Sequence, residues 1–371
     1  MGSRLASAVT SVAGVARAPV VADASIRVDL LHQLELTLES VISDDGGAFV
    51  TAICRDADAR RVVLKYIHRG SSDASRRLRN EITLFQQLSV HPPLRLLVHR
   101  RSGPEYLLTE FDSGILLRPD AINPRMTESI AQALVQFQGL QTDLQQHRVH
   151  DREHLATYYL KVLLKNLAHL WPAHISTTEA VRCQAIVAAG LPAICRTQVI
   201  CHGDFLPTNL LYHPNDDSIT FTDLEGFISG NHPLFDVLAI CTIGSAELTG
   251  WEWQRLFLSR YLSAGRATLR LDPRSRDYLD AYRAILIFFL VYRMSEQRMD
   301  LTGGAYFEGV SKARFLSRKA GGLLRGRRAA WHDDALGSAL QVRQQNLRRA
   351  LSPSGYREHF EMMHASAAVA R

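Results

Sequence analysis

The sequence has no hydrophobic run long enough to cross a lipid bilayer. Its most apolar stretch, Ala284–Tyr292, is far shorter than the roughly 20 residues that a membrane helix requires. We therefore expect a buried core helix there and no transmembrane segment. The N-terminus also lacks the compact apolar core, flanked by charge, that a secretory signal peptide carries, so we expect no export by that route.

Cysteine and N-terminal acidic residues are also scarce. The five cysteines contain no Cys-x₂-Cys pair, which argues against a disulfide framework or a structural zinc site. We expect reduced thiols and a cytoplasmic location. No acidic residue precedes Asp23, and residues 1–24 are rich in Ala, Ser and Val. We expect a disordered tail there, with a transit peptide as the alternative.

Two regions of different pattern follow the tail. Strand-like, β-branched segments are concentrated between residues 25 and 110, and the later sequence is mostly helical in its pattern. Amphipathic stretches at Met126–Leu144, Leu155–Leu170 and Arg274–Arg298 predict three long helices. The composition, with 46% hydrophobic residues in 371, is sufficient for two substantial cores. The pattern predicts an α+β fold.

One constellation of polar residues is typical of phosphoryl transfer. Residues 202–209 read His-Gly-Asp-Phe-Leu-Pro-Thr-Asn, and Asp223-Leu-Glu225 follows after a short segment. Transfer of a phosphoryl group needs one carboxylate that orients and accepts the proton of a hydroxyl. It also needs an amide oxygen and a second carboxylate that hold Mg²⁺ against the ATP phosphates. Asp204, Asn209 and Asp223 have the residue types for these three tasks.

The sequence between these residues predicts a hairpin. Apolar residues follow Asn209, residues 213–217 are dense in turn formers, and Ile219–Thr222 is typical of a returning strand. Such a hairpin returns Asp223 to the neighbourhood of Asn209. The alternative is an ordinary hairpin with solvated carboxylates in its turn, which leaves the His-Gly-Asp triplet without an explanation.

These residues resemble the signature of the aminoglycoside phosphotransferase and choline kinase family. That signature, His-Gly-Asp-x₄-Asn followed by a strand and Asp-x-Glu, is matched at residues 202–209 and 223–225. The resemblance implies the two-lobed protein-kinase-like fold, with a small antiparallel-sheet N-lobe carrying one key helix and a larger helical C-lobe. The lobes would comprise residues 25–111 and 112–371. The resemblance to this family covers roughly residues 36–240.

The resemblance also implies roles for individual residues. Asp204 would be the catalytic base, and Asn209 and Asp223 would be the Mg²⁺ ligands. His202 and Asp236 would hold the catalytic loop in place without reacting. For Glu225, a role near the metal and a structural role stay open as alternatives.

The N-terminal region must then supply the ATP site. Lys65 lies in the middle of the β-branched strand Arg61–Ile67, as in the Val-Ala-Ile-Lys strand of kinases. Glu81 lies on a helical segment sixteen residues later and would pair with Lys65, which would contact the α- and β-phosphates. Taken alone, a lysine on a solvated strand face is the simpler interpretation of Lys65.

Two further segments of the ATP site are less distinct. Gly46 and Gly47 lie between two predicted strands, where their backbone amides could approach a phosphate, although the same pair suits a plain hairpin turn. The pattern Gly-x-Gly-x-x-Gly is absent. By resemblance, backbone groups near Glu110 and Asp112 would bind the adenine at the hinge between the lobes. An ordinary edge strand is the alternative.

The charge distribution bears on the partners. The net charge of +6 disfavours a strongly cationic acceptor. Residues 312–328 contain seven basic and no acidic side chains, which predicts either a solvated surface or attraction to an anionic lipid or glycolipid. Nucleic acid is not expected, because the chain shows no recognised nucleic-acid-binding module.

The sequence thus predicts an ATP- and Mg²⁺-dependent kinase that phosphorylates a hydroxyl group of a small molecule. One alternative is a kinase of a lipopolysaccharide or glycolipid sugar. Another is a pseudokinase that binds nucleotide and regulates a partner. Protein kinase activity is disfavoured, since the His-Arg-Asp, Asp-Phe-Gly and Ala-Pro-Glu motifs are absent.

Overall fold

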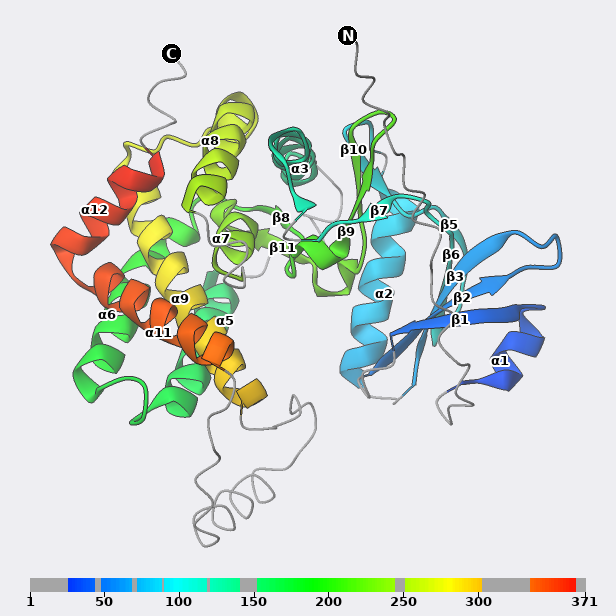
Figure 1. The fold of residues 1–371 in the computed structure, drawn as a ribbon, viewed down its shortest axis with the longest axis horizontal. Helices are drawn as coiled ribbons and strands as arrows, with labels where there is room; N and C mark the ends of the chain where they lie inside the picture. The colour runs from blue at the N-terminus through cyan, green and yellow to red at the C-terminus, as the bar shows by residue number, and fades with distance from the viewer. Residues whose placement is uncertain are drawn as a thin grey trace, which may run out of the picture.

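The computed structural model describes most of the chain in two lobes (Figure 1). The described residues are 26–43, 48–68, 72–88, 90–118, 121–140, 152–243, 251–301 and 334–364. Three of the segments discussed above, residues 1–24, Gly46–Gly47 and 312–328, lie outside them. A sheet with one long helix forms the first lobe, and a bundle of helices forms most of the second.

The first lobe is built on an antiparallel five-stranded sheet with the strand order β1-β2-β3-β6-β5. The strands are β1 (Thr37–Ser43), β2 (Phe49–Arg55), β3 (Arg61–Ile67), β5 (His99–Ser102) and β6 (Tyr106–Glu110). Side chains alternate between the two faces of the sheet. On β3, Val62, Leu64 and Tyr66 face a core shared with helix α1 (Val28–Gln33). Lys65 therefore lies on the opposite face.

Helix α2 (Ser72–Gln87) belongs to the core on the other side from α1. Its buried apolar residues Leu78, Leu84 and Phe85 recur at helical spacing. Glu81 lies on the same buried face, with only 2% of its side chain exposed. A carboxylate is this deeply buried only when it is paired, and the partner here is Lys65.

A second sheet, β4-β10-β9-β7, carries the hairpin that the sequence predicts. Strands β9 (Leu210–His213) and β10 (Ser218–Phe221) are antiparallel, and Phe221 pairs with Leu210 at the open end of the hairpin. The outer strands are β4 (Leu94–Leu96), parallel to β10, and β7 (Ile115–Leu116). Strand β4 thus joins a sheet whose other strands follow residue 111. The lobe boundary at 111 stays a prediction.

A short antiparallel pair of strands flanks the segment that contains the β9–β10 hairpin. Strand β8 (Val199–Cys201) is antiparallel to β11 (Ile228–Asn231). Single 3₁₀ turns lie at Pro207–Asn209 (η2) and Leu224–Gly226 (η3).

Helices form the rest of the second lobe (Figure 1). They are α3 (Pro124–Gln138), α5 (Arg152–Leu170), α6 (Thr177–Ile194), α7 (Leu234–Ile243), α8 (Trp251–Thr268), α9 (Arg276–Leu301), α11 (Asp334–Leu351) and α12 (Pro353–His364). The three long helices predicted from the sequence correspond to α3, α5 and α9. No helix in the described ranges is both long and apolar enough to cross a bilayer.

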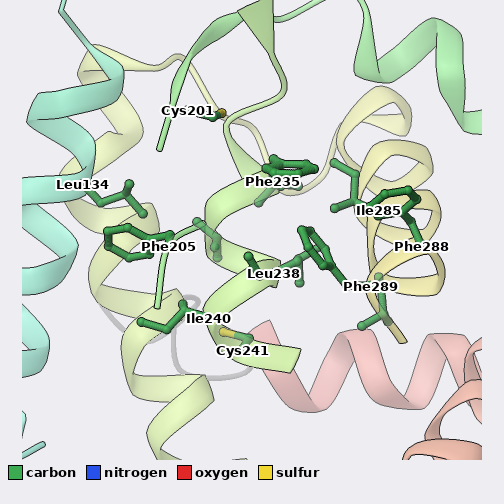
Figure 2. Close-up of a cluster of buried hydrophobic side chains, with 14 of the residues drawn as sticks. Leu134, Cys201, Phe205, Phe235, Leu238, Ile240, Cys241, Ile285, Phe288 and Phe289 are labelled. Carbon is green, nitrogen blue, oxygen red and sulfur yellow. The ribbon is translucent and has the colours of Figure 1, made fainter. Parts of the chain in front are cut away.

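Aromatic and aliphatic side chains join these helices to the loop after β8 (Figure 2). Phe205 is fully buried among residues that include Leu134 of α3 and Ile240 of α7. Phe235 of α7 contacts Phe289 of α9, with ring centroids 4.9 Å apart. The loop that follows β8 is thus anchored by its own apolar residue in the core of the second lobe.

Candidate active site

The loop after β8 is held by the carboxylate of Asp236 at the start of α7. Its Oδ2 accepts a hydrogen bond from His202 N–H at 2.8 Å, and its Oδ1 accepts one from Gly203 N–H at 3.1 Å. Gln138 of α3 donates its side-chain amide to the same carboxylate at 3.4 Å. Burial raises the pKa of Asp236, and these donors and the nearby His202 act in the opposite direction. Asp236 thus fixes the backbone just before Asp204.

His202 is fully buried and links the loop to the end of the hairpin. Its Nε2 lies 3.0 Å from the carbonyl oxygen of Thr222, and its Nδ1 accepts a 3.4 Å hydrogen bond from Asp204 N–H. Burial lowers the pKa of His202, so the ring is neutral at pH 7. A neutral ring that donates from Nε2 and accepts at Nδ1 satisfies both contacts. His202 therefore ties Asp204 to the residue that precedes Asp223.

Position 203 accommodates only glycine. Its φ of 87° lies in the region that favours glycine, and a Cβ atom there would collide with the carbonyl oxygen of Gly226. The loop and the η3 turn are therefore in backbone contact.

Asp204 and Asn209 are brought together by the η2 turn. The side-chain amide nitrogen of Asn209 donates to the Asp204 carbonyl oxygen at 2.9 Å and to its Oδ2 at 3.2 Å. Burial raises the pKa of Asp204, and the positive charge of Arg293 opposes this rise. Since the nitrogen of Asn209 points at Asp204, its carbonyl oxygen remains for another partner. The backbone of Asn209 also accepts from Thr222 N–H at 3.0 Å, which places it next to Asp223.

Lys65 lies among three carboxylates contributed by both lobes. Its Nζ is 2.9 Å from Glu81 Oε2, 2.6 Å from Asp223 Oδ1 and 2.7 Å from Glu225 Oε2. Burial alone would lower the pKa of Lys65, but these carboxylates outweigh it and raise the pKa, so the ammonium stays charged. Only 12% of the side chain is exposed. The alternative of a lysine on a solvated strand face is therefore wrong.

Asp223 is the most open of the three carboxylates. Its side chain is 40% exposed, and its backbone is left-handed with a φ of 56°. Burial would raise the pKa of its carboxyl, but the ammonium of Lys65 prevails and holds it below the usual range. Glu81 also accepts from Leu224 N–H at 3.1 Å, so helix α2 holds the backbone on the C-terminal side of Asp223.

Arg77 was not identified from the sequence. It lies one helical turn before Glu81 on α2, forms an ion pair with Glu225 Oε1, and stacks 5.4 Å from the Phe49 ring centroid. Glu225 is therefore shared between Lys65 and Arg77, as a link between α2 and η3. In the sequence, Arg77 could be recognised only by its spacing of one helical turn from Glu81. Its ion-pair partner, Glu225, is distant in the chain.

The predicted hinge residues Glu110 and Asp112 lie where β6 ends. The Glu110 N–H donates to the Val98 carbonyl at 2.9 Å, so only its carbonyl oxygen could serve a ligand. The Asp112 carboxylate accepts from Thr220 Oγ1 at 2.7 Å and from Gly114 N–H at 2.7 Å. Asp112 thus attaches the hinge to β10 through its side chain. Gly46 and Gly47 lie outside the described residues.

The donor set suits a hard divalent cation. Carboxylate and amide oxygens are the ligands that Mg²⁺ takes in proteins, and Asp223 and Asn209 offer one of each at the end of the hairpin. Ligand atoms of Glu81, Asp223 and Glu225 also lie within 4.8 Å of one another. Lys65 already neutralises part of that acidic group, so the partly exposed Asp223 is the member best placed to hold a metal.

Comparison with known proteins identifies the family. A sequence profile described as the phosphotransferase enzyme family matches residues 44–280, which is more than half of the chain. The chain belongs to this family. The resemblance inferred from the His-Gly-Asp-x₄-Asn motif is thereby confirmed, as is its enzyme class. Among curated proteins, no sequence matches this phosphotransferase.

Solved structures confirm the protein-kinase-like fold of this phosphotransferase. An ethanolamine kinase of Plasmodium vivax aligns with a TM-score of 0.52 at 14% identity, over 89% of this chain and 86% of that one. The amicoumacin kinase hAmiN, in complex with AMP-PNP, Ca²⁺ and Ami, gives 0.53 at 14% identity over 86% and 90%. A thermostable mutant of aminoglycoside phosphotransferase APH(4)-Ia, with ADP and hygromycin B, gives 0.53 at 10% identity over 88% and 98%. At these identities the likeness concerns the fold alone.

Proposed function

We propose that this phosphotransferase moves the γ-phosphoryl group of ATP to a hydroxyl group of a small molecule, with Mg²⁺ as the metal. The observation that carries the proposal is the convergence of four distant segments. The β8–β9 loop contributes Asp204 and Asn209, the end of β10 contributes Asp223, and β3 with α2 contributes the Lys65–Glu81 pair. A structural hairpin alone would not require these groups to meet.

Asp204 is the base in this proposal. The acceptor hydroxyl donates to its carboxylate and passes its proton there. The hydroxyl oxygen forms a bond to the γ-phosphorus, the bond from that phosphorus to the β–γ bridging oxygen breaks, and ADP leaves. The hydrogen bond from Asn209 to Oδ2 fixes the orientation of the carboxylate. Asp236 and His202 position the loop and do not react.

The remaining residues bind the nucleotide and the metal. Asn209 and Asp223 would hold Mg²⁺, which neutralises charge on the phosphates when bound. Lys65, kept charged and held by Glu81, would contact the α- and β-phosphates. The backbone carbonyl of Glu110 and the N–H of Asp112 would bind adenine. Gly46 and Gly47 would cover the phosphates.

The relatives support the nucleotide and a divalent metal. The hAmiN complex contains AMP-PNP and Ca²⁺, and the APH(4)-Ia complex contains ADP. The same complexes contain Ami and hygromycin B, which supports a small-molecule acceptor here. The five cysteines are free and buried, which supports the proposed cytoplasmic location.

The test is transfer of label from [γ-³²P]ATP into an extract of the source cells. We expect Asp204→Ala and Asp223→Ala each to lower kcat by at least about a hundredfold, the low end for loss of a general base or an electrostatic group. Partitioning of the label between organic, small aqueous and macromolecular fractions then gives the acceptor class. Near-normal turnover of either variant would contradict the assignment, and Mg²⁺-dependent ATP binding without turnover would favour a pseudokinase.

A glycolipid sugar is the second candidate acceptor, and residues 312–328 favour it. The segment carries seven basic and no acidic side chains, a composition suited to an anionic membrane surface. Replacing Arg325, Arg327 and Arg328 by Gln should then abolish transfer to a lipid-linked acceptor and leave transfer to a soluble one unchanged. Equal loss for both acceptors would contradict a surface role.

A further inference from the structure

Arg293 of α9 is buried close to the proposed catalytic loop. Phe289 lies one helical turn before it and packs against Phe235, the neighbour of the Asp236 that holds the loop (Figure 2). Helix α9 therefore runs along the support of Asp204. Among the charges that act on Asp204, the guanidinium of Arg293 is the strongest, and it opposes the effect of burial on the pKa.

Within the described residues, the guanidinium uses only part of its donor capacity. One nitrogen is paired with Glu296 one turn later, and the Tyr292 ring centroid lies 5.0 Å from the guanidinium carbon. Within the described residues, its Nε is buried with no hydrogen-bond acceptor. Only 12% of the side chain is exposed, although a guanidinium offers five N–H groups. Burying a cation with unfilled donors is unfavourable. Nε itself is closed to solvent, so a further acceptor would have to bind the terminal nitrogens of the guanidinium.

A second arginine adds to the positive charge. Arg343 of α11 is 8% exposed and donates to the backbone carbonyl of Arg293 at 3.4 Å. Burial, together with the charge of Arg293, lowers the pKa of Arg343 to about 10, which leaves it charged at pH 7. Glu296 offsets one of the two positive charges. Arg293, Arg343 and Glu296 together keep one net positive charge, which would attract an anion to Arg293 and repel an ammonium group.

We infer that the acceptor of this phosphotransferase carries an oxyanion, a carboxylate or a phosphate, which Arg293 binds while a hydroxyl of the same molecule faces Asp204. The inference rests on the proposed function, because it places the acceptor beside Asp204. It separates this chain from enzymes whose acceptors are amino sugars or amino alcohols. The planar fork of an arginine suits either oxyanion, since both accept two parallel hydrogen bonds.

The first test is calorimetric titration of enzyme saturated with AMP-PNP and Mg²⁺, so that the γ-phosphate position is filled. The probes share one sugar ring: glucose, glucosamine, glucuronate and glucose 6-phosphate. We expect the two anions to bind more tightly than glucose, and glucosamine to bind more weakly. Comparison of glucuronate with glucose 6-phosphate shows whether the site prefers a carboxylate or a phosphate. Equal affinity for all four, or a preference for glucosamine, would overturn the inference.

The second test uses variants in the same titration. Arg293→Gln should weaken binding of the preferred anion at least about tenfold, the loss typical of one charge-assisted hydrogen bond. Arg293→Lys keeps the positive charge but lacks the planar guanidinium, so its affinity for the anion should lie between that of the wild type and that of Arg293→Gln. Arg348→Gln on the exposed side of α11 is the matched control and should bind like the wild type. Unchanged anion affinity in a folded Arg293→Gln protein would contradict the inference.

Activity distinguishes this inference from the proposed function. In the extract assay, Asp204-dependent label in a product that carries a carboxylate or phosphate besides the transferred phosphate supports both. Asp204-dependent label confined to products whose acceptor was neutral or cationic before the transfer would overturn the inference and leave the kinase intact. Absence of any Asp204-dependent label would count against the kinase itself, while the calorimetric titration would still decide whether Arg293 binds an oxyanion.

Discussion

At the scale of single residues, the site depends on groups that satisfy one another across long sequence distances. Lys65 stays charged in a buried position because carboxylates from α2 and from the segment after β10 surround it. His202 stays neutral because it is buried, and its two nitrogens still find partners. Each side chain has a defined protonation state before any ligand binds, which favours positioning and electrostatic catalysis.

Gly203 gives the sharpest prediction at this scale. Gly203→Ala places a Cβ atom against the Gly226 carbonyl at a positive φ, so we expect a loss of about 2 kcal/mol or more in the free energy of unfolding, together with loss of activity. Urea denaturation measures the change. The matched control is Gly226→Ala, whose Cβ would have no neighbour closer than 4.0 Å. Equal stability of the two variants would contradict the geometry.

Arg77 carries a second prediction. Arg77→Gln removes the ion pair with Glu225, which then competes more strongly for Lys65. We expect kcat/KM for ATP to fall about tenfold, as for the loss of one charge-assisted hydrogen bond. Steady-state kinetics on ATP measure this, with the exposed Arg79→Gln on the same helix as the control. A variant of Arg77 with unchanged kinetics would show that Glu225 needs no second cation.

At the scale of elements, polar contacts at helix ends decide how the C-terminal helices dock. Arg283 of α9 donates to the Ala350 carbonyl at 3.1 Å and to the Leu351 carbonyl at 3.0 Å, at the end of α11. The last carbonyls of a helix have no partner within the helix, so a cation there supplies the missing donors. Arg283 thus attaches α11, which carries Arg343, to α9, which carries Arg293.

Removal of this contact should loosen that attachment. We expect Arg283→Met to lower the free energy of unfolding by about 2 kcal/mol, because two buried carbonyls lose charged donors. Thermal or urea denaturation measures the loss. Arg276→Met at the start of the same helix is the control, since that side chain is 93% exposed and its pair with Asp280 is loose at 3.5 Å. A comparable loss in both variants would mean that the carbonyl contacts add nothing.

At the scale of the whole molecule, buried histidines make stability depend on pH. Burial lowers the pKa of His359 and of His364 to about 4, from 6.5 in an exposed histidine. Below pH 6.5 the unfolded chain binds protons that the folded chain does not, so stability falls as the pH falls from 6.5 toward 4. His202 and His232 are buried and shifted in the same direction.

We therefore expect the free energy of unfolding to fall with decreasing pH, by on the order of 1 kcal/mol per pH unit for each such histidine. Urea denaturation between pH 7.5 and about 4.5, across this titration range, measures the slope. The double variant His359→Gln, His364→Gln should show a shallower slope, while the contributions of His202 and His232 remain. An identical slope in the variant would contradict the assignment to these two residues.

Much of the fold and of the candidate site could be predicted from local patterns. The hairpin that returns Asp223 to Asn209 follows from strand and turn residues within a short segment. The positions of Lys65 on an apolar strand and Glu81 on an amphipathic helix follow from periodicity. Arg77, Gln138 and Arg293 could not be identified in this way, because each is defined by a partner on a distant element.

The sequence by itself determined the family, the two-lobed fold and the residue types that phosphoryl transfer needs. These depend on motif spacing and on hydrophobic periodicity, which are local properties of the chain. Only the tertiary structure decided that Lys65 is shared among three carboxylates, that Asp236 holds the catalytic loop, and that the charge of Arg293 acts on Asp204. The reason is physical: burial and charge pairing arise when distant segments pack, and sequence distance does not determine them.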